Sequence, residues 1–244
     1  MKHKVLLTLF ILFNMAKGVR QMSRYVMSDI HGCYDEFISM LEKINFTDDD
    51  ILYILGDIFD RGPQPLKVLD YILGKDNIIM IKGNHEKMFE ESLISDDYIL
   101  WYFNGGYVTH SQLKERGEEE IQKVYDYVKK LPLIKVVNKC ILVHAGFESY
   151  DDSVELDEFL TQSENTCVWS RANIGNEKKY RDYTVICGHT PVQNIEEGCN
   201  SILKRYGTIY IDCGCCFGEN VKGRLSCLRL DDMKEFYVSA IAVK

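Results

Sequence analysis

Five short polar motifs contain the residue types that bind metal ions and phosphate. Each follows a run of apolar residues, and together they hold four of the six histidines in the 244-residue chain. The motifs are Asp29-Ile30-His31-Gly32, Gly56-Asp57-Ile58-Phe59-Asp60-Arg61-Gly62, Gly83-Asn84-His85-Glu86, His144-Ala145-Gly146 and Gly188-His189-Thr190. Their imidazoles, carboxylates and amide oxygen form the ligand set of a two-metal hydrolase. Any one motif could occur by chance, but the full set predicts a dinuclear phosphoesterase centre.

Six side chains in these motifs are predicted to bind the metal ions. Asp29 and His31 are two residues apart, so both fall on one side of the chain if strand geometry persists across them. Asp57 supplies a second carboxylate that could bridge two ions. The remaining ligands, an amide oxygen and two imidazoles, come from Asn84, His144 and His189. This mixture suits manganese, with iron or zinc as alternatives, and the lack of a thiolate argues against a structural zinc site.

Residues beside these ligands predict the rest of the chemistry. His85 follows Asn84 directly, and because neighbouring residues point different ways it is available as the general acid that protonates a leaving alkoxide. A cationic imidazole beside two metal ions needs a carboxylate partner, which Asp60 or Glu86 could provide. Arg61 can donate two hydrogen bonds to phosphate oxygens, which lysine cannot do as well.

Alternating strands and helices are expected to position the first three motifs. The apolar runs 24–27, 51–55 and 78–81 are typical of strands, and each ends at a motif. The first helix is expected to bury Phe37, Met40, Leu41 and Ile44. The second helix, which starts at Pro65, is expected to bury Leu66, Leu69, Ile72 and Leu73. The third helix, which starts near Glu86, is expected to bury Met88, Phe89 and Leu93. This order predicts a parallel sheet with right-handed crossovers. Because ligands bind at the carboxyl ends of such strands, the motifs should meet at one edge.

The second half of the chain is rich in strands. They are expected at 134–137, 140–143, 183–187, 208–211, 225–230 and 235–238. Strands this numerous indicate a second sheet packed on the first, in an α/β fold. Residues 96–131 are mostly polar, helical in composition and free of motifs, so we expect a helical cap over the rim of the site. Residues 22–244 are expected to form a single domain, as the chain length allows.

Composition narrows the range of partners. A net charge of −8, a pI near 5.3 and the lack of a basic stripe argue against nucleic acid. Nine cysteines in a chain of this length indicate reduced thiols and a cytoplasmic location. Cys213, Cys215 and Cys216 lie close together, but no second pair follows at zinc-finger spacing. We therefore expect small residues at a strand end there rather than an extra metal or redox site.

Residues 1–21 differ from the rest of the chain. Lys2 and Lys4 precede the apolar run 5–13, and Ala16-Lys17-Gly18 follows, a pattern that resembles a signal peptide. The run is too short to span a bilayer, so no stable membrane insertion is expected. Met22 stands just before the first strand, where a cytoplasmic enzyme would begin. An over-long N-terminal extension is therefore favoured over secretion, because the cysteines indicate a reducing compartment.

These motifs resemble the phosphoprotein phosphatase family of calcineurin-like metallophosphoesterases, specifically the small bacterial and phage-lambda type. The resemblance runs from about residue 24 to the C-terminus. It implies a two-sheet β-sandwich with helices on both outer faces, two divalent ions per chain, and hydrolysis of phosphoserine, phosphothreonine or also phosphotyrosine in proteins. The first ion would be held by Asp29, His31 and Asp57, and the second by Asp57, Asn84, His144 and His189.

The same resemblance implies roles for the neighbouring residues. His85 would be the general acid, Asp60 its carboxylate partner, and Arg61 the residue that binds phosphate. Trp169-Ser170-Arg171 matches the place where lambda-type enzymes carry a second phosphate-binding arginine, so Arg171 is the candidate. Ile211-Asp212-Cys213-Gly214 matches a strand-end motif that usually has threonine at position 213. The longer C-terminal region and extra loop of eukaryotic members are absent, so no regulatory subunit is implied.

A sister group, the symmetrical dinucleoside tetraphosphate hydrolases, is the main alternative. Its members share Gly62-Pro63, but they usually lack the acid at position 60 and carry Asp at position 86. Asp60 and Glu86 therefore favour a phosphoprotein or phosphopeptide substrate. In the wider phosphodiesterase group, the last motif is normally Gly-His-x-His. Here proline occupies position 191, where that motif has its second histidine, which argues against membership of the group. A metal-binding pseudoenzyme would have lost the acid or the phosphate clamp, and both are present here.

Overall fold

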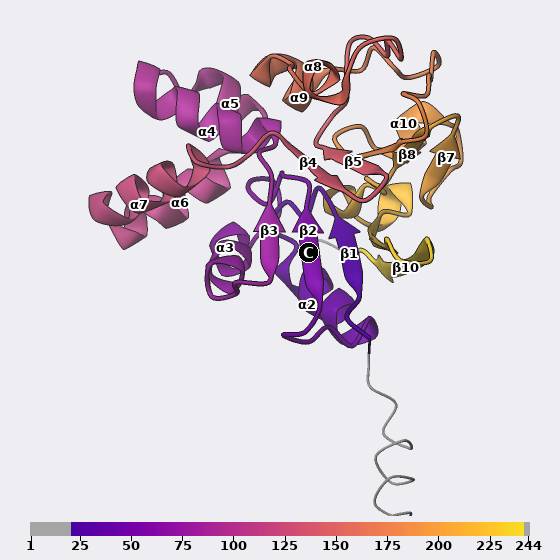
Figure 1. Ribbon diagram of the computed structural model, residues 1–244. Coiled ribbons are helices and arrows are strands. Elements are labelled where there is room, and N and C mark those ends of the chain that lie inside the picture. The colour runs from indigo at the N-terminus through magenta and orange to yellow at the C-terminus, as the bar shows by residue number, and fades with distance from the viewer. Residues whose placement is uncertain (1–20, 242–244) are drawn as a thin grey trace, which may run out of the picture.

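The computed structural model describes residues 21–241, which form two five-stranded sheets flanked by helices (Figure 1). The first, sheet A, has the strand order β10-β9-β1-β2-β3. Its strands are β1 (Arg24–Met27), β2 (Ile51–Ile54), β3 (Ile78–Met80), β9 (Arg224–Arg229) and β10 (Lys234–Ser239). β1, β2 and β3 are parallel, as predicted, whereas β9 runs antiparallel to β1 and to β10.

Sheet B has the strand order β4-β5-β6-β8-β7. Its strands are β4 (Ile134–Val137), β5 (Cys140–Val143), β6 (Thr184–Cys187), β7 (Leu203–Arg205) and β8 (Thr208–Tyr210). β5, β6 and β8 are parallel, and the two edge strands are antiparallel to their neighbours. The sequence did not predict β7, because this short edge strand is only partly buried and two of its three residues are basic.

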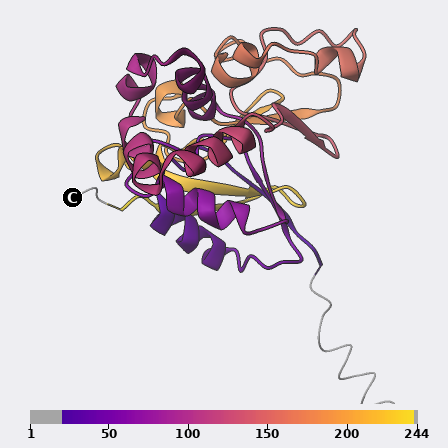
Figure 2. The same ribbon diagram turned by 90° about the vertical axis from the view of Figure 1, so that its left-hand side faces the viewer.

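Side-chain alternation along sheet A creates two separate cores. On β1, Tyr25 and Met27 pack into the core beneath the helices, whereas Val26 between them packs into the core shared with sheet B. Tyr53 on β2 joins this second core as well. Because successive strand residues point to opposite faces, sheet A is covered by helices on one face and by sheet B on the other (Figure 2).

The helices complete the expected two-sheet α/β architecture. Helices α2 (Tyr34–Lys43) and α3 (Pro65–Leu73) connect the parallel strands, and α2 also contacts β9 and β10. The other helices are α4 (Asn84–Ser95), α5 (Ile99–Phe103), α6 (Tyr107–Arg116), α7 (Glu118–Val128), α8 (Leu156–Phe159), α9 (Glu164–Trp169) and α10 (Val192–Ile195), with 3₁₀ turns η1 (Cys215–Phe217) and η2 (Glu219–Val221).

The predicted inner faces of the first three helices are largely confirmed. Buried side chains are Phe37, Met40, Leu41 and Ile44; Leu66, Leu69 and Ile72; and Met88 and Phe89. Leu93 is partly buried, and the prediction for Leu73 is wrong. Leu73 is the last residue of α3 and remains 51% exposed, because Gly74 ends the helix there. Helix α4 begins at Asn84, two residues before the predicted start.

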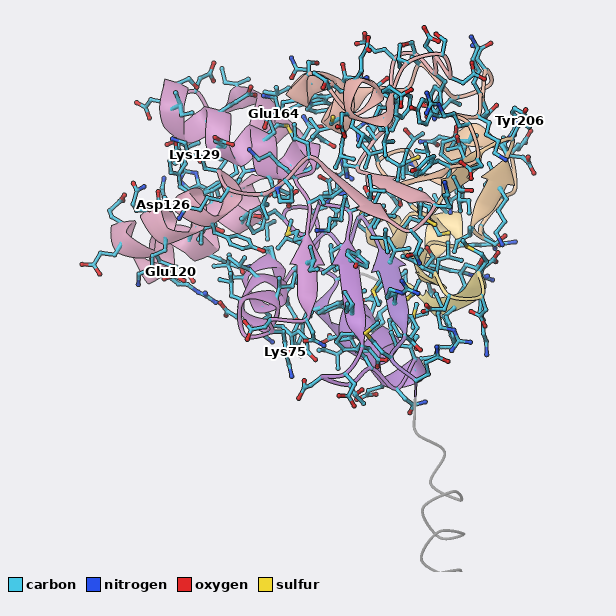
Figure 3. All side chains as sticks on the ribbon, viewed as in Figure 1. Lys75, Glu120, Asp126, Lys129, Glu164 and Tyr206 are labelled. Atoms are coloured by element: carbon cyan, nitrogen blue, oxygen red, sulfur yellow. The ribbon has the colours of Figure 1, made fainter. Side chains whose placement is uncertain are left out.

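Helices α5, α6 and α7 occupy the segment that was predicted to be helical, residues 96–131. Helix α7 is amphipathic: Ile121 and Val124 are buried, whereas Asp126 and the adjoining Lys129 point outward (Figure 3). Within residues 21–241, no helix combines the length and apolar content needed to cross a membrane. The signal-like N-terminal extension falls outside the described residues, apart from residue 21.

Candidate metal centre

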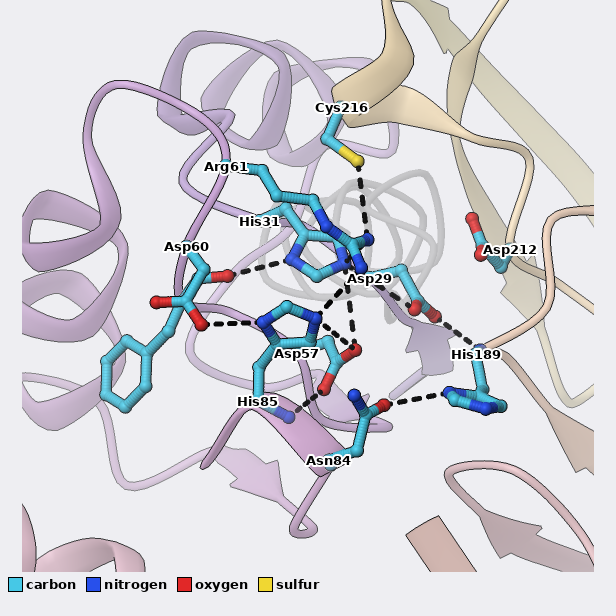
Figure 4. Close-up of polar contacts among 12 residues, drawn as sticks. Asp29, His31, Asp57, Asp60, Arg61, Asn84, His85, His189, Asp212 and Cys216 are labelled. Atoms are coloured by element: carbon cyan, nitrogen blue, oxygen red, sulfur yellow. Dashed lines mark hydrogen bonds and ion pairs between the residues drawn. The ribbon is translucent and has the colours of Figure 1, made fainter. Parts of the chain in front are cut away.

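The five motifs meet between the two sheets, at the carboxyl ends of their parallel strands (Figure 4). Asp29, Asp57 and Asn84 follow β1, β2 and β3 of sheet A, and His144 and His189 follow β5 and β6 of sheet B. All five side chains are buried. The structure therefore brings together polar groups from distant parts of the chain, at the edge where parallel strands present ligands.

Several of these residues adopt a left-handed backbone conformation. The φ angles of Asp29, His31, Asp57 and His189 are 51°, 45°, 55° and 66°. A non-glycine residue in this region carries about 1–3 kcal/mol of strain, so the surroundings must hold it there. Backbone hydrogen bonds between the loops do so: the N–H of His31 donates to the Asp57 carbonyl at 2.9 Å. A Cβ at position 83 would collide with Asp57 Oδ1, which is why the turn before Asn84 requires glycine.

Backbone carbonyls determine which ring nitrogen of two histidines carries the proton. His144 Nδ1 lies 2.6 Å from the carbonyl oxygen of Leu55, and His31 Nδ1 lies 2.8 Å from that of Phe59. A carbonyl oxygen only accepts hydrogen bonds, so each Nδ1 must donate. The lone pair of each imidazole is therefore on Nε2, the atom that faces the centre. Such a carbonyl contact is the usual way to orient a metal-binding histidine.

The lone pairs of the centre point at one another. His144 Nε2 lies 2.9 Å from Asn84 Oδ1 and 3.4 Å from Asp57 Oδ2. His31 Nε2 lies 3.6 Å from the same Asp57 oxygen. When the imidazoles are neutral, His144 Nε2, Asn84 Oδ1 and Asp57 Oδ2 are all acceptors with no hydrogen to share among them, whereas His31 Nε2 can accept from Arg61 Nη1 at 2.7 Å. Such an arrangement is unfavourable unless a cation lies among them.

Two sets of ligand atoms fit two cations. Within each set the atoms lie within 4.8 Å of one another. One set is Asp57, His144 and His189, and the other is His31, Asp57 and His85, although His85 was predicted to be the acid and not a ligand. Asp57 belongs to both, as a bridging carboxylate would. In addition, Asp29 Oδ1 and His189 Nε2 are buried and have no hydrogen-bond partner among the described residues. Leaving buried polar atoms unpaired is unfavourable, and a bound ion would satisfy them.

Electrostatics also favours bound cations at this centre. Burial, followed by the charge of Asp29, raises the pKa of both Asp57 and Asp212 well above the usual range. Burial also lowers the pKa of His31 and of His144, which keeps these imidazoles neutral. Neutral imidazole is the form that binds metal, and nearby cations would stabilise the ionised carboxylates.

Asp60, rather than Glu86, is the carboxylate that pairs with His85. His85 Nδ1 lies 2.6 Å from Asp60 Oδ2, which also accepts a hydrogen bond from Trp101 Nε1 at 2.8 Å. The other oxygen of Asp60 accepts from the Thr109 hydroxyl at 2.5 Å. Burial raises the pKa of Asp60 to about 7. Trp101 and Thr109 belong to α5 and α6 and lie in no motif, so no sequence pattern indicated either contact.

Glu86 has a structural role in this arrangement. Its carboxylate accepts hydrogen bonds from the backbone N–H groups of Asp57, Ile58 and Gly83 at 2.8, 3.0 and 2.9 Å. Burial raises its pKa to about 7. Glu86 thereby fixes the loop that carries Asp57 against the start of α4.

The guanidinium of Arg61 contacts both His31 and His85. Its Nη1 is 2.7 Å from His31 Nε2, and its Nη2 is 2.9 Å from His85 Nε2. Nη1 also contacts the sulfur of Cys216 at 3.8 Å. The backbone N–H of Arg61 donates to the carbonyl of Gly105, just after α5, at 3.4 Å. The guanidinium is therefore held at the centre by contacts from several segments.

Arg171 lies at the rim, on the sheet B side. Its Nε donates to the Thr190 hydroxyl at 3.1 Å, directly after His189, and its side chain is exposed. After burial and His144, the charge of Arg171 contributes to lowering the pKa of His189. The guanidinium of Arg171 therefore lies near His189, and its role in binding phosphate stays a prediction.

Asp212 is a buried residue of the centre to which the sequence assigned no role. It lies close enough to Asp29 for the charge of Asp29 to raise its pKa, and its Oδ1 accepts the backbone N–H of Gly214 at 2.8 Å (Figure 4). A signal was available, because Asp212 follows the apolar run 208–211 just as each motif follows a strand. Cations bound at the centre would favour the ionised form of Asp212, which would then add negative charge there.

Comparison with known proteins extends these observations. A sequence model of the calcineurin-like phosphoesterase family matches residues 22–229. The chain is 31% identical over 202 residues to serine/threonine-protein phosphatase 2 of Salmonella typhimurium, a match that covers 78% of this chain and 86% of that protein. It is 37% identical over 139 residues to the symmetrical bis(5'-nucleosyl)-tetraphosphatase of Wigglesworthia glossinidia brevipalpis, covering 51% of this chain and 45% of that protein.

A solved structure shares the fold. A protein serine/threonine phosphatase from Saccharomyces cerevisiae superposes with a TM-score of 0.63 at 14% identity, covering 93% of this chain and 82% of that chain. The family match covers residues 22–229, which include the motifs that form the centre, and the Salmonella relative covers 78% of the chain. The chain therefore belongs to the calcineurin-like phosphoesterase family.

Proposed function

We propose that this metallophosphoesterase is a protein-serine/threonine phosphatase. The observation that carries the proposal is the buried pair of His85 and Asp60, joined at 2.6 Å. Dinucleoside tetraphosphatases usually lack an acid at position 60, so its presence favours a phosphoprotein phosphatase, and here Trp101 and Thr109 hold that acid in place. The Salmonella phosphatase, which aligns over 86% of its length, supports the same activity.

The calcineurin-like family uses a dinuclear metal site. We propose manganese for this chain, with the ligands Asp29, His31, Asp57, Asn84, His144 and His189. When bound, the two ions would activate the attacking water and neutralise charge on the phosphate oxygens. The converging lone pairs and the two unpaired buried atoms of the centre support this assignment.

The two arginines are proposed to bind the phosphate. A phosphomonoester dianion presents three terminal oxygens, and the planar guanidinium of Arg61 can donate to two of them. In the structure, Arg61 directs both terminal nitrogens at the centre, where they contact His31 and His85. Arg171, held by Thr190, is placed to approach the phosphate from the opposite sheet.

His85 is proposed to deliver the proton. Its Nδ1 is fixed by Asp60, so Nε2 faces Arg61 and the phosphate site, and the proton on Nε2 would pass to the leaving alkoxide oxygen. Burial and the charge of Arg61 lower the pKa of His85 in the free protein. A bound phosphate dianion, together with ionised Asp60, would raise that pKa and favour the cationic acid.

Hydrolysis of symmetrical dinucleoside tetraphosphates is the second candidate function. The Wigglesworthia relative supports it, and so do exposed aromatic side chains beside the centre. Phe103 and Tyr107 are 90% and 65% exposed and flank Gly105, whose carbonyl holds the Arg61 backbone. A nucleobase could stack on these rings. The helices at 96–131 would then act as the proposed cap and also supply the base-binding surface.

A direct substrate comparison tests the choice. We expect kcat/KM to be higher for a phosphothreonine peptide than for diadenosine tetraphosphate when manganese is saturating. A preference of about a hundredfold for the dinucleotide, about 2.7 kcal/mol in transition-state binding, would overturn the proposal. Phe103→Ala is the matched variant, because it should reduce dinucleotide hydrolysis selectively only if the aromatic rings bind a base.

We also propose that the enzyme acts in the cytoplasm. The nine cysteines all lie within the described residues, and all are free thiols. Free thiols are typical of proteins in a reducing compartment.

A further inference from the structure

Two cysteines and a glutamate meet beside the phosphate clamp. Cys33 precedes α2, Glu36 lies in its first turn, and Cys215 begins η1. All three are buried, and one ligand atom from each lies within 4.8 Å of the others. The Cys33 thiol donates a hydrogen bond to the carbonyl oxygen of His31 at 3.7 Å. Segments that are far apart in the sequence thus place two sulfur atoms and a carboxylate at one point.

The three donors are held in position by the surrounding backbone. Cys33 and Glu36 are three residues apart, so the start of one helix presents both on the same side. The Glu36 carboxylate accepts the backbone N–H of Ile241 at 2.8 Å. Cys215 is fixed by the 3₁₀ turn, in which Gly218 N–H donates to its carbonyl at 3.2 Å. Such fixed donors need little rearrangement to bind an ion.

A cavity gives access to this cluster. Its volume is about 320 Å³, and its walls include Cys33, Glu36, Cys215 and the neighbouring Cys216. An ion can therefore reach the sulfur atoms from solvent, and there is room for a water molecule to occupy a further coordination position. The site also adjoins the clamp, because Cys216 contacts Arg61 at 3.8 Å.

We propose that Cys33, Glu36 and Cys215 bind one thiophilic divalent cation, such as Zn²⁺, at a site separate from the dinuclear centre. Two thiolates and one carboxylate suit this class of ion, and three protein ligands leave a fourth, tetrahedral position for water. The thiols release their protons to solvent as the ion binds. The proposed dinuclear centre offers oxygen and nitrogen only, so the two sites prefer different metals. For Cys215, this proposal departs from the expectation from sequence that Cys213, Cys215 and Cys216 are small residues at a strand end.

Cadmium titration tests the proposal with a readout independent of activity. The reduced protein, saturated with manganese and kept free of oxygen, is titrated with Cd²⁺ while ultraviolet thiolate-to-metal charge transfer is recorded. Cadmium that enters the dinuclear centre gives no such band, because no thiol is a ligand there. We expect a band that saturates at one Cd²⁺ per chain.

Matched variants locate the band. Cys33→Ser and Cys215→Ser should each remove most of it, whereas Cys199→Ser, a part-buried cysteine outside the cluster, should leave it unchanged. Glu36→Gln keeps an oxygen that can accept the Ile241 N–H, so this variant should fold. Both thiols remain, so it should keep the band, but without the carboxylate charge it should bind cadmium at least about tenfold more weakly. Thermal melting followed by circular dichroism identifies any variant that does not fold. A missing band in the wild type, a band that both serine variants retain, or unchanged affinity in Glu36→Gln would overturn the site.

Discussion

Replacing Asp60 by asparagine separates the charge of this side chain from its hydrogen bonds. The carboxylate accepts from His85 and Trp101 on one oxygen and from Thr109 on the other. An amide oxygen at the first position still accepts from the histidine and the tryptophan. The Thr109 hydroxyl can turn and accept from the amide NH₂ at the second. The variant should therefore fold, with a small change in its free energy of unfolding.

The main effect of Asp60→Asn should be on the proton donor. A hydrogen bond to a charged group contributes about 1.5–3 kcal/mol, and a neutral one about 0.5–1.5 kcal/mol. Cationic His85 therefore loses about 1–2 kcal/mol of stabilisation. At about 1.4 kcal/mol per factor of ten, turnover of a phosphothreonine peptide should fall by about five- to thirtyfold.

The assay compares two leaving groups with manganese saturating. Turnover of p-nitrophenyl phosphate should fall much less, because its aryl leaving group needs little protonation. Metal content and melting temperature are measured on the same samples. Trp101→Phe is the control, since it removes a neutral donor to Asp60 and leaves the carboxylate charge intact. Equal losses on both substrates, or unchanged turnover of the peptide, would refute the reasoning.

Three further predictions concern the centre. Asp57→Asn should lower manganese content from two ions toward none, because the shared carboxylate is proposed to bind both; elemental analysis that still finds two ions would exclude the bridge. Arg61→Ala should lower kcat/KM, because it removes about 2–4 kcal/mol of transition-state stabilisation. Steady-state kinetics that show no loss would contradict the proposed binding of phosphate by Arg61. In metal-free protein, burial raises the Glu86 pKa from 4.5 to about 7. The contribution of Glu86 to the stability of the metal-free protein is therefore present below pH 4.5 and is lost as pH rises to 7. The difference in melting temperature between manganese-loaded and chelated protein should widen over that interval. A constant difference in fluorescence-monitored melts would count against this effect of Glu86.

The N-terminal half of the centre could be predicted from local sequence. Asp29, Asp57 and Asn84 each follow an apolar strand, and parallel pairing brings consecutive strand ends to one edge. The contribution of His144 and His189 was harder to foresee. The strands indicated a second sheet, and the motifs identified both histidines as candidate ligands. The packing that brings the strand ends of this sheet to the first sheet depends on tertiary contacts, which local sequence does not show.

Contacts between distant residues account for what the sequence did not predict. Trp101 and Thr109 reach Asp60 across 41 and 49 residues, and neither lies in a patterned motif. Cys33 and Cys215 are brought together only by the packing of η1 against α2. Local periodicity identifies a buried face or a strand, whereas it does not show which residue will lie opposite. Leu73 shows the other limit, since helical spacing cannot locate the residue at which a helix ends.

The position of β1 in sheet A has a consequence for how the protein is made. β1 pairs with β2 on one side and with β9 on the other, and the backbone N–H of Arg24 donates to Asp231, 207 residues later. At about 5–20 residues per second, ribosomal synthesis leaves that edge of β1 unpaired for about 10–40 seconds. The His189 N–H reaches Asp29 across 160 residues as well. The proposed ligands Asp29 and His189 can therefore come together only after residue 189 has been translated, and the open β1 edge is where a nascent chain would need chaperone protection.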